Sequence, residues 1–425
     1  MVFSDILYGR IETPEWLDSF IRLPEFLRLR GVRLSNVDSI EFKDFNGPTR
    51  WEHCIGVAHL ALTYCRYKKL TFSDTVHITL AALLHDIATP PFAHTVEYVL
   101  QGFNHEDESN RLLMAKQSND SSPSTAIFAS QLPQFNDVCS KISRQIKIKI
   151  DPDEVARYVT GDGEFGFLIN GSIDLDNIDN VIRACTFMGI EVNRKTPLEL
   201  IKWLTQYSTA PTDLEKSKND WVINWLGYKN LMYSRFYNSS DQELGRQAFL
   251  QHLIRRVNKQ GLSRTSIIWN TDEQLLNVIE NFSHDDHQNF FKNSLADLVQ
   301  RYKLLDKTEK LTEIELDLNT LRVLRNPIVS SWLEEKLSSD TLEVFVFVKS
   351  RRYKEENNLF PSAAGAVMVF KLGTQPIKFS QLPIWQQEVL SKETKGKMLN
   401  RQYSNTIKGQ LYKWVNDKPW LNLNE

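Results

Sequence analysis

The sequence predicts a mainly α protein, with a helical core followed by a smaller C-terminal α+β subdomain. Apolar residues recur at steps of three and four through most of the first part of the 425 residues, which is the spacing of amphipathic helices. Beyond about residue 300, the segments TLEVFVFVKS and AGAVMVFKL are instead rich in β-branched and aromatic side chains, which favour strands. A hydrophobic fraction of 41% is that of a globular protein, and a chain of 425 residues divides more naturally into two or three domains than into one.

This change of character divides the chain into three expected parts. We expect a helical core over residues 1–190, a helical extension that completes it over 191–304, and the α+β subdomain over 305–425. Strands are expected at residues 341–350 and 364–372. Helical spacing covers these segments: 16–29, 53–65, 74–85, 95–103, 175–190, 200–207, 221–237 and 241–257.

The net charge and the cysteines indicate which binding partners and which cellular compartment to expect. A net charge of −2 gives the chain no overall attraction for nucleic acid. Nucleic acid stays a possible partner, but the charge does not indicate it. The four cysteines are widely spaced and are interpreted as reduced thiols. No signal peptide pattern and no apolar run long enough to cross a membrane is found, so we expect a cytoplasmic protein without a membrane partner.

The segment LLHDIATPPFAH, residues 83–94, ends an apolar helix with a histidine and an aspartate. Adjacent side chains on a helix point about 100° apart, so His85 and Asp86 both turn inward only if something polar lies between them. Burying this pair without partners costs several kcal/mol, which a metal ion offsets. The sequence therefore predicts that the two residues ligate one divalent metal ion.

Further ligands of the same chemical types occur on both sides of this pair. His53 begins an amphipathic helix upstream, and Asp174, Asp176 and Asp179 enter another helix downstream. Such a mixed nitrogen and oxygen set suits Mn, Mg, Fe, Ni, Co or Zn, and the residue types do not choose among these metals. Asp174 or Asp179 can instead cap the helix that it enters.

The order His, His-Asp and Asp resembles that of the HD-domain superfamily of metal-dependent phosphohydrolases. Several motifs resemble its deoxynucleoside triphosphate triphosphohydrolase branch, in the right order over about residues 4–190: SDILYGRIE, PEFLRLR, RWEH, PPFAH, FNHEDES and INGSIDLDNID. Each motif is weak by itself, but the set is specific. The resemblance implies that the first part of the chain forms the helical core of an HD domain.

The resemblance also implies roles for individual residues. The metal ligands would be four side chains, with Asp176 preferred because it is the second aspartate of the matching D-x-D: His53, His85, Asp86 and Asp176. Arg50 would contact a substrate phosphate, for which the fixed donor fork of arginine is suited.

Two more histidines match positions that lie beside the reacting phosphate in this branch. His94 and His105 would act there as proton donors or as polarising groups. The carboxylate of Glu97 or of Glu106 would orient one of the two imidazoles, and the sequence leaves both candidates open.

Some residues keep a structural interpretation beside the functional one. Arg50 can form an ion pair with Asp44 or Glu52 instead of contacting a substrate. The cluster HDDH at residues 284–287 lies between polar residues and is interpreted as a solvated turn rather than as a metal site. The other helical histidines of the first part are interpreted as core residues: His59 and His77.

The chain departs from the branch at the expected substrate contacts. Leu34 stands where the branch has a glutamine that contacts the sugar. Asn177 and Asn180 stand where it has a lysine and a tyrosine that contact triphosphate, and Thr89 replaces a histidine at the rim of the site. We therefore expect an intact metal centre beside altered substrate-binding positions.

These patterns predict a metal-dependent nucleotide phosphohydrolase. The resemblance implies hydrolysis of (deoxy)nucleoside triphosphates to nucleoside and triphosphate by a metal-activated water. Two alternatives stay open, an HD-type phosphodiesterase or nuclease acting on cyclic or oligonucleotide substrates, and a nucleotide-sensing module with low turnover. The resemblance further implies a nucleotide substrate, a possible nucleotide effector and a homo-oligomer.

Overall fold

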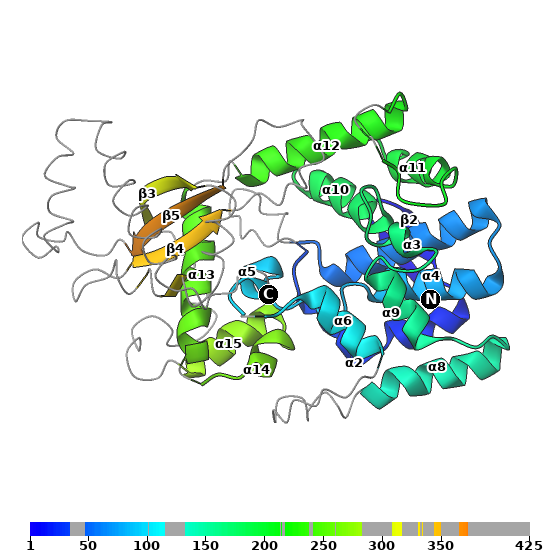
Figure 1. The fold of residues 1–425 in the computed structure, drawn as a ribbon, viewed down its shortest axis with the longest axis horizontal. Helices are drawn as coiled ribbons and strands as arrows, with labels where there is room; N and C mark the ends of the chain where they lie inside the picture. Colours follow the sequence, from blue (N-terminus) through cyan, green and yellow to red (C-terminus); the bar gives the residue numbers. More distant parts are fainter. Residues whose placement is uncertain are drawn as a thin grey trace, which may run out of the picture. The chain divides into compact units, whose positions relative to one another are not determined.

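The chain forms two compact units in the computed structural model (Figure 1). The first unit comprises Met1–Glu97, Gly102–Asn238 and Leu262–Val278; the second comprises Tyr98–Gln101, Ser239–Gly261 and Ile279–Glu425. The structure describes these residues: 1–34, 47–100, 102–114, 132–212, 214, 217–237, 241–259, 261–282, 308–316, 330–331, 334, 344–349 and 365–372.

Helices make up most of the first unit, as the sequence predicts. An antiparallel hairpin of β1 (Val2–Asp5) and β2 (Gly9–Glu12) precedes them, and the sequence analysis does not predict these two strands. Short 3₁₀ helices span Glu15–Leu17, Leu29–Gly31 and Gly166–Leu168. The α-helices are α1 (Asp18–Ile21), α2 (Pro24–Arg28), α3 (Arg50–Lys68), α4 (Phe72–Leu84), α5 (His94–Glu97), α6 (His105–Leu113), α8 (Leu132–Ile146), α9 (Pro152–Val159), α10 (Leu175–Phe187), α11 (Thr196–Leu204), α12 (Asp220–Tyr237), α14 (Arg264–Ile268) and α15 (Asp272–Phe282), the last of which begins in this unit.

Helices α3 and α4 form the centre of the first unit. They pack along each other, while α10 and α11 pack against α3, and α9 packs against α4. Apolar side chains of both helices, such as Leu60 and Leu83, are fully buried. Full burial of one leucine side chain stabilises a fold by about 2 kcal/mol, so these contacts fix the helices that carry the site.

Side-chain caps determine where the two central helices begin. Thr49 and Glu52 form a capping box, in which each side chain accepts a hydrogen bond from the backbone N–H of the other residue. The side chain of Thr71 accepts from the backbone N–H of Asp74 in the same way. These caps fix the register of both helices, and therefore the face on which their histidines lie.

Two of the predicted helices differ from the structure. The segment 16–29 is divided at Pro24, which occupies the first turn of α2, where proline is favoured. The helix predicted over 95–103 is wrong beyond Glu97, where α5 ends, and Gly102 then takes a left-handed φ of 63°. The chain turns so that the backbone N–H of His105 reaches the Glu97 carboxylate, and this tertiary contact outweighs the apolar spacing.

The second unit contains a long helix and a three-stranded antiparallel sheet. The strands lie in the order β3 (Thr308–Leu316), β5 (Gly365–Leu372), β4 (Val344–Lys349), and α13 (Asp241–Lys259) packs against β3 and β4. Strands β4 and β5 lie within the two segments that the sequence predicts as strands. Strand β3 is not predicted from the sequence, because its segment TEKLTEIEL contains several charged residues among the apolar ones. The three-part division of the chain and the α+β subdomain as a whole stay predictions.

Two expectations from composition can be compared with the described residues. All four cysteines are buried, and no disulfide joins them within the described residues: Cys54, Cys65, Cys139 and Cys185. Within the described part of the chain, no helix combines the length and the apolar character that crossing a bilayer requires.

Candidate metal centre

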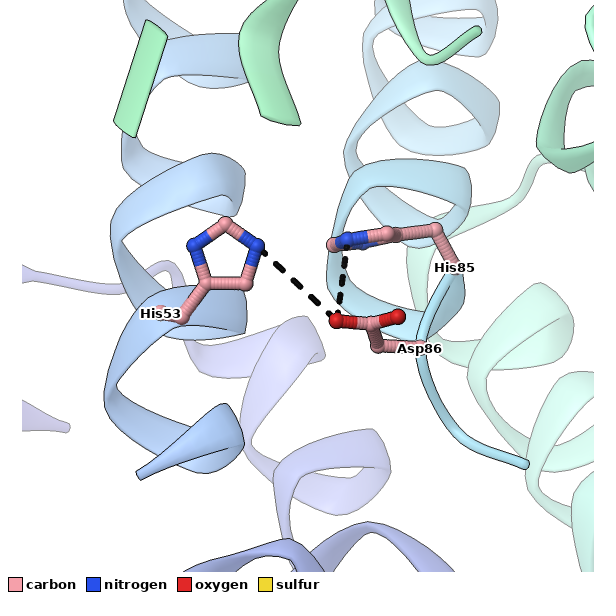
Figure 2. Close-up of side chains that lie close together, drawn as sticks. All are labelled: His53, His85 and Asp86. Atoms are coloured by element: carbon pink, nitrogen blue, oxygen red, sulfur yellow. Dashed lines mark ion pairs between the residues drawn. The ribbon is translucent and has the colours of Figure 1, made fainter. Parts of the chain in front are cut away.

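Three helices of the first unit bring the four predicted ligands together. His53 lies in the first turns of α3, His85 caps the C-terminus of α4 and is followed by Asp86, and Asp176 lies in the first turn of α10. Figure 2 shows the rings of His53 and His85, each joined by an ion pair to one oxygen of the Asp86 carboxylate. Residues more than 120 positions apart in the sequence therefore face one small volume.

Short distances join these side chains. Asp176 Oδ1 lies 2.9 Å from His53 Nε2 and 3.7 Å from His85 Nε2. Asp86 Oδ2 lies 3.9 Å from His53 Nε2 and 3.5 Å from His85 Nε2. The side chains of His53, His85 and Asp86 are at most 8% exposed, whereas that of Asp176 is 30% exposed. Three of the four side chains are therefore buried, and the centre reaches solvent at Asp176.

The hydrogen bonds of the two histidines suit a metal ion. His53 Nδ1 bonds to Asp179 at 2.7 Å, and His85 Nδ1 bonds to the carbonyl of Ala82 at 2.9 Å. Both Nε2 atoms are buried, and among the described residues neither of them has a hydrogen-bond partner, although carboxylate oxygens lie nearby. A histidine that donates from Nδ1 presents the Nε2 lone pair, so two nitrogens and two carboxylates fit a divalent ion.

The charges of this centre shift its titration. Burial by itself would lower the pKa of His85, but the carboxylates of Asp86 and Asp176 outweigh it and raise this pKa to about 9. Burial would raise the pKa of Asp86, yet the guanidinium of Arg50 and the imidazole of His85 hold it well below its usual range. Without a metal ion, the site therefore keeps its carboxylates ionised beside a protonated imidazole.

We expect metal binding to release a proton and to strengthen as the pH rises toward the His85 pKa of about 9. Below this pKa the imidazole is protonated in the metal-free protein, and its nitrogen must lose the proton before it binds a metal. The apparent affinity should rise about tenfold per pH unit in that range. Calorimetric titration with Mn²⁺ in two buffers of different ionisation enthalpy counts the released protons, and a pH-independent affinity without proton release would contradict the ligand assignment.

A buried network behind His53 is a functional feature that the sequence analysis did not find. The Asp179 carboxylate bonds to His53 Nδ1 and accepts two hydrogen bonds from Arg183, at 2.8 and 2.9 Å. Tyr8 O–H donates to the same carboxylate at 2.8 Å, and Asp5 pairs with Arg183 at 3.0 Å. Carboxylates of this kind fix the tautomer and orientation of a histidine ligand.

Charge spacing on α10 is the signal that could have revealed part of this network. Asp176, Asp179 and Arg183 lie at steps of three and four, on one face of the helix. A carboxylate and a guanidinium one turn apart on an otherwise apolar face indicate a buried pair. The helix cap comes from Asp174 instead, whose carboxylate accepts the backbone N–H of Asn177 at 2.6 Å.

Gly56 leaves the room that this network needs. A Cβ at this position would lie 2.3 Å from Asp179 Oδ2 and 2.6 Å from an Arg183 nitrogen. We expect Gly56→Ala to displace the pair from His53 and to weaken metal binding about 10- to 100-fold. Competition titration with a chromophoric chelator measures this affinity.

The matched control for this variant is Gly227→Ala in α12, where an added Cβ meets nothing within 4 Å. An alanine there should leave metal affinity unchanged and stabilise the fold by up to about 1 kcal/mol, as is usual inside a helix. Wild-type metal affinity in Gly56→Ala would show that the network does not support His53.

Arg50 contacts the metal centre directly. Its Nη1 atom lies 2.6 Å from Asp86 Oδ2, and both side chains are less than a tenth exposed. Within the described residues, Arg50 therefore pairs with Asp86 and not with either carboxylate that the sequence suggested. Glu52 instead accepts a hydrogen bond at the cap of α3, and Asp44 lies outside the described residues. The buried guanidinium stands at the edge of the centre, where a phosphate contact was expected.

The second predicted pair of histidines shares one carboxylate. Glu97 Oε2 lies 2.5 Å from His94 Nδ1, and Glu97 Oε1 lies 3.0 Å from His105 Nδ1. His105 Nε2 lies 3.7 Å from Asp86 Oδ1, so this cluster adjoins the metal centre. Of the two carboxylates that the sequence left open, Glu97 holds both imidazoles, while Glu106 lies half-buried in the first turn of α6.

The residues expected to contact substrate are described by their own hydrogen bonds and burial. The side-chain amide of Asn177 donates to both oxygens of the Asp174 carboxylate, at 3.0 and 2.9 Å, and Asn180 is half-buried on α10. Leu34 is buried at 5% exposure just before a range outside the described residues. The HDDH cluster at 284–287 also lies outside the described residues.

Comparison with known families matches an HD domain to residues 50–159 of this chain. The match includes His53, the His85–Asp86 pair and both histidines that bond to Glu97. Asp176 follows beyond it, on α10.

Comparison with individual proteins gives relatives of different coverage. The deoxynucleoside triphosphate triphosphohydrolase SAMHD1 homolog of Dictyostelium discoideum is 31% identical over 125 residues, which cover 26% of this chain and 24% of that protein. The chain therefore matches about a quarter of that relative's length. An uncharacterized protein of Methanocaldococcus jannaschii is 21% identical over 424 residues, 97% of this chain and 83% of that protein.

Comparison with solved structures shows the same fold. A phosphohydrolase from Bacteroides thetaiotaomicron superposes with a TM-score of 0.54 at 15% sequence identity, over 88% of this chain and 100% of that one. At this identity the likeness concerns the fold and does not extend to the substrate.

Proposed function

Because this chain is an HD-domain phosphohydrolase, we propose that it hydrolyses (deoxy)nucleoside triphosphates to nucleoside and triphosphate at the centre between α3, α4 and α10. One observation carries the proposal: two buried imidazole Nε2 atoms, which have no hydrogen bond within the described part of the chain, face two ionised carboxylates. A divalent ion held by the four side chains would supply Lewis-acid chemistry and an activated water for attack on phosphorus.

The chain's own residues would bind the phosphate and move protons. Arg50 would hold a phosphate oxygen with the guanidinium nitrogens that do not bond to Asp86. His94 and His105 would present their Nε2 atoms to the substrate, because Glu97 occupies both Nδ1 atoms. A protonated imidazole in this place can give its proton to the leaving oxygen as the bond to phosphorus breaks.

Support for the triphosphate substrate comes from the named activity of the Dictyostelium relative and from the motifs shared with its branch. A phosphodiesterase is the second candidate, and one observation favours it. The Asn177 amide is held by Asp174 and carries no charge, so this position offers a triphosphate no cation.

Product analysis distinguishes the two candidates. The purified protein is incubated with Mn²⁺ and with deoxynucleoside triphosphates, ribonucleoside triphosphates, cyclic and linear dinucleotides, or single-stranded DNA, and the products are separated by ion-exchange chromatography. Release of intact triphosphate is the expected result. Cleavage of the diesters alone would replace the proposal by the phosphodiesterase, and the absence of any product with metal bound would leave the sensing module.

A further inference from the structure

The turn that leads into His94 has an unusual backbone. Phe92 and Ala93 have φ angles of 54° and 48°, in the left-handed region that residues other than glycine rarely adopt. Both are buried, at 4% and 0% exposure. Because His94 comes next, this conformation sets the direction in which its imidazole approaches Glu97.

A carboxylate from a distant part of the first unit holds this turn. Asp272 Oδ1 accepts the backbone N–H of Phe92 at 2.8 Å, and Asp272 Oδ2 accepts from Arg33 Nε at 2.6 Å. The Arg33 guanidinium also lies over the Phe92 ring, 4.5 Å from its centroid. One ion pair therefore holds Phe92 both by its backbone and by its ring.

The position of Asp272 is itself fixed by the start of α15. Thr271 precedes the helix, and its hydroxyl accepts the backbone N–H of Gln274 at 3.3 Å, while the Gln274 side chain accepts the backbone N–H of Thr271 at 2.9 Å. Gly31 allows this helix start to approach, because a Cβ at that position would lie 2.6 Å from a Thr271 methyl carbon. Asp272 therefore occupies the first turn of a capped helix.

A second contact attaches the same segment to the loop between α4 and α5, at the end of this loop that follows the His-Asp pair. The guanidinium of the half-buried Arg28 donates to the carbonyls of Ile87 and Thr89, at 3.0 and 2.7 Å, directly after the His-Asp pair. Its other terminal nitrogen donates to the carbonyl of Asn270 at 3.0 Å. The loop between α4 and α5 is thus attached near both of its ends to residues 270–272, outside the matched HD domain.

We propose that Asp272 is a positioning residue for His94. It holds Phe92 and Ala93 in the left-handed turn, and this turn keeps the His94 imidazole against Glu97 beside the metal centre. The consequence for hydrolysis rests on the function proposed above, whereas the positioning of the loop does not. The residue that completes the site therefore comes from a segment 180 positions away in the sequence.

The test compares Asp272→Ala with the double variant Asp272→Ala/Ala93→Gly. In the single variant, kcat should fall about tenfold to a hundredfold with KM and metal content nearly unchanged, because a displaced imidazole affects proton transfer more than binding. Amide hydrogen exchange in residues 90–97 should become faster. Glycine adopts the left-handed conformation without a steric cost, so the double variant should recover most of the lost kcat and of the exchange protection.

Glu273→Ala is the matched control, because it removes the neighbouring, exposed carboxylate of the same helix turn. It should leave kcat and exchange unchanged. Unchanged exchange in residues 90–97 of Asp272→Ala would overturn the proposal, as would a loss of kcat that Ala93→Gly fails to rescue. If the wild-type protein hydrolyses none of the nucleotides, the proposed function fails and the exchange measurement alone decides: faster exchange confined to this loop supports the positioning role, and unchanged exchange refutes it.

Discussion

The double variant His85→Ala/Asp86→Ala is expected to bind no divalent metal and to lose turnover by about a thousandfold or more. Only two of the four facing side chains remain in it, one of them the partly exposed Asp176. The contribution of a catalytic metal is several kcal/mol, and each 1.36 kcal/mol corresponds to about a factor of ten in rate. Metal content is measured by mass spectrometry of the purified protein, and turnover by chromatography of the products.

The control for this variant is His77→Gln on the same helix. His77 is a buried histidine whose ring bonds to the carbonyl of Ser73 and to the backbone N–H of Asp151, as a core histidine does. Its replacement should leave metal content unchanged. Turnover that persists at the wild-type rate in His85→Ala/Asp86→Ala would place the active site elsewhere in the chain.

Glu97→Gln is expected to lower kcat about a hundredfold while metal content stays at the wild-type value. The buried carboxylate holds both His94 and His105, and an amide has one acceptor oxygen for the two N–H groups. Burial by itself would lower the pKa of His105, but Glu97 outweighs it and keeps this pKa raised. Removing the negative charge lowers the pKa again, so the activity that needs protonated His105 should disappear at a lower pH.

The pH dependence of kcat measures this effect, with the alkaline limb displaced toward lower pH in Glu97→Gln. Glu106→Gln is the comparison, because the sequence allows either carboxylate to orient an imidazole and the structure places Glu97 between them. A larger loss of activity in Glu106→Gln than in Glu97→Gln would reverse this assignment.

The elements that hold the ligands could be predicted because local patterns specify them. His85 and Asp86 end a helix whose other residues are apolar, and a buried pair of this kind needs a polar partner. The choice of Asp176 over Asp174 came from the resemblance to a D-x-D motif. In the structure Asp174 caps α10, while Asp176 lies against His53.

The supporting residues could not be predicted because they meet through the tertiary fold. Tyr8 and Asp179 are 171 positions apart, and Phe92 and Asp272 are 180 positions apart. Neither spacing nor amphipathic pattern indicates which distant carboxylate reaches a given backbone N–H or phenol. The short helix α5 was mispredicted for the same reason, since the contact between Glu97 and His105 ends it.

Hydrolysis in ¹⁸O-labelled water shows which bond of the substrate this protein breaks. A deoxynucleoside triphosphate is incubated with the Mn²⁺-loaded protein, and the products are analysed by mass spectrometry. Attack of water on the α-phosphorus breaks its bond to the sugar oxygen, so we expect the label in the released triphosphate and none in the nucleoside. Label in the nucleoside would mean attack on carbon, and labelled monophosphate or orthophosphate in place of triphosphate would mean cleavage at another bond. Either result would refute the proposed triphosphohydrolase reaction.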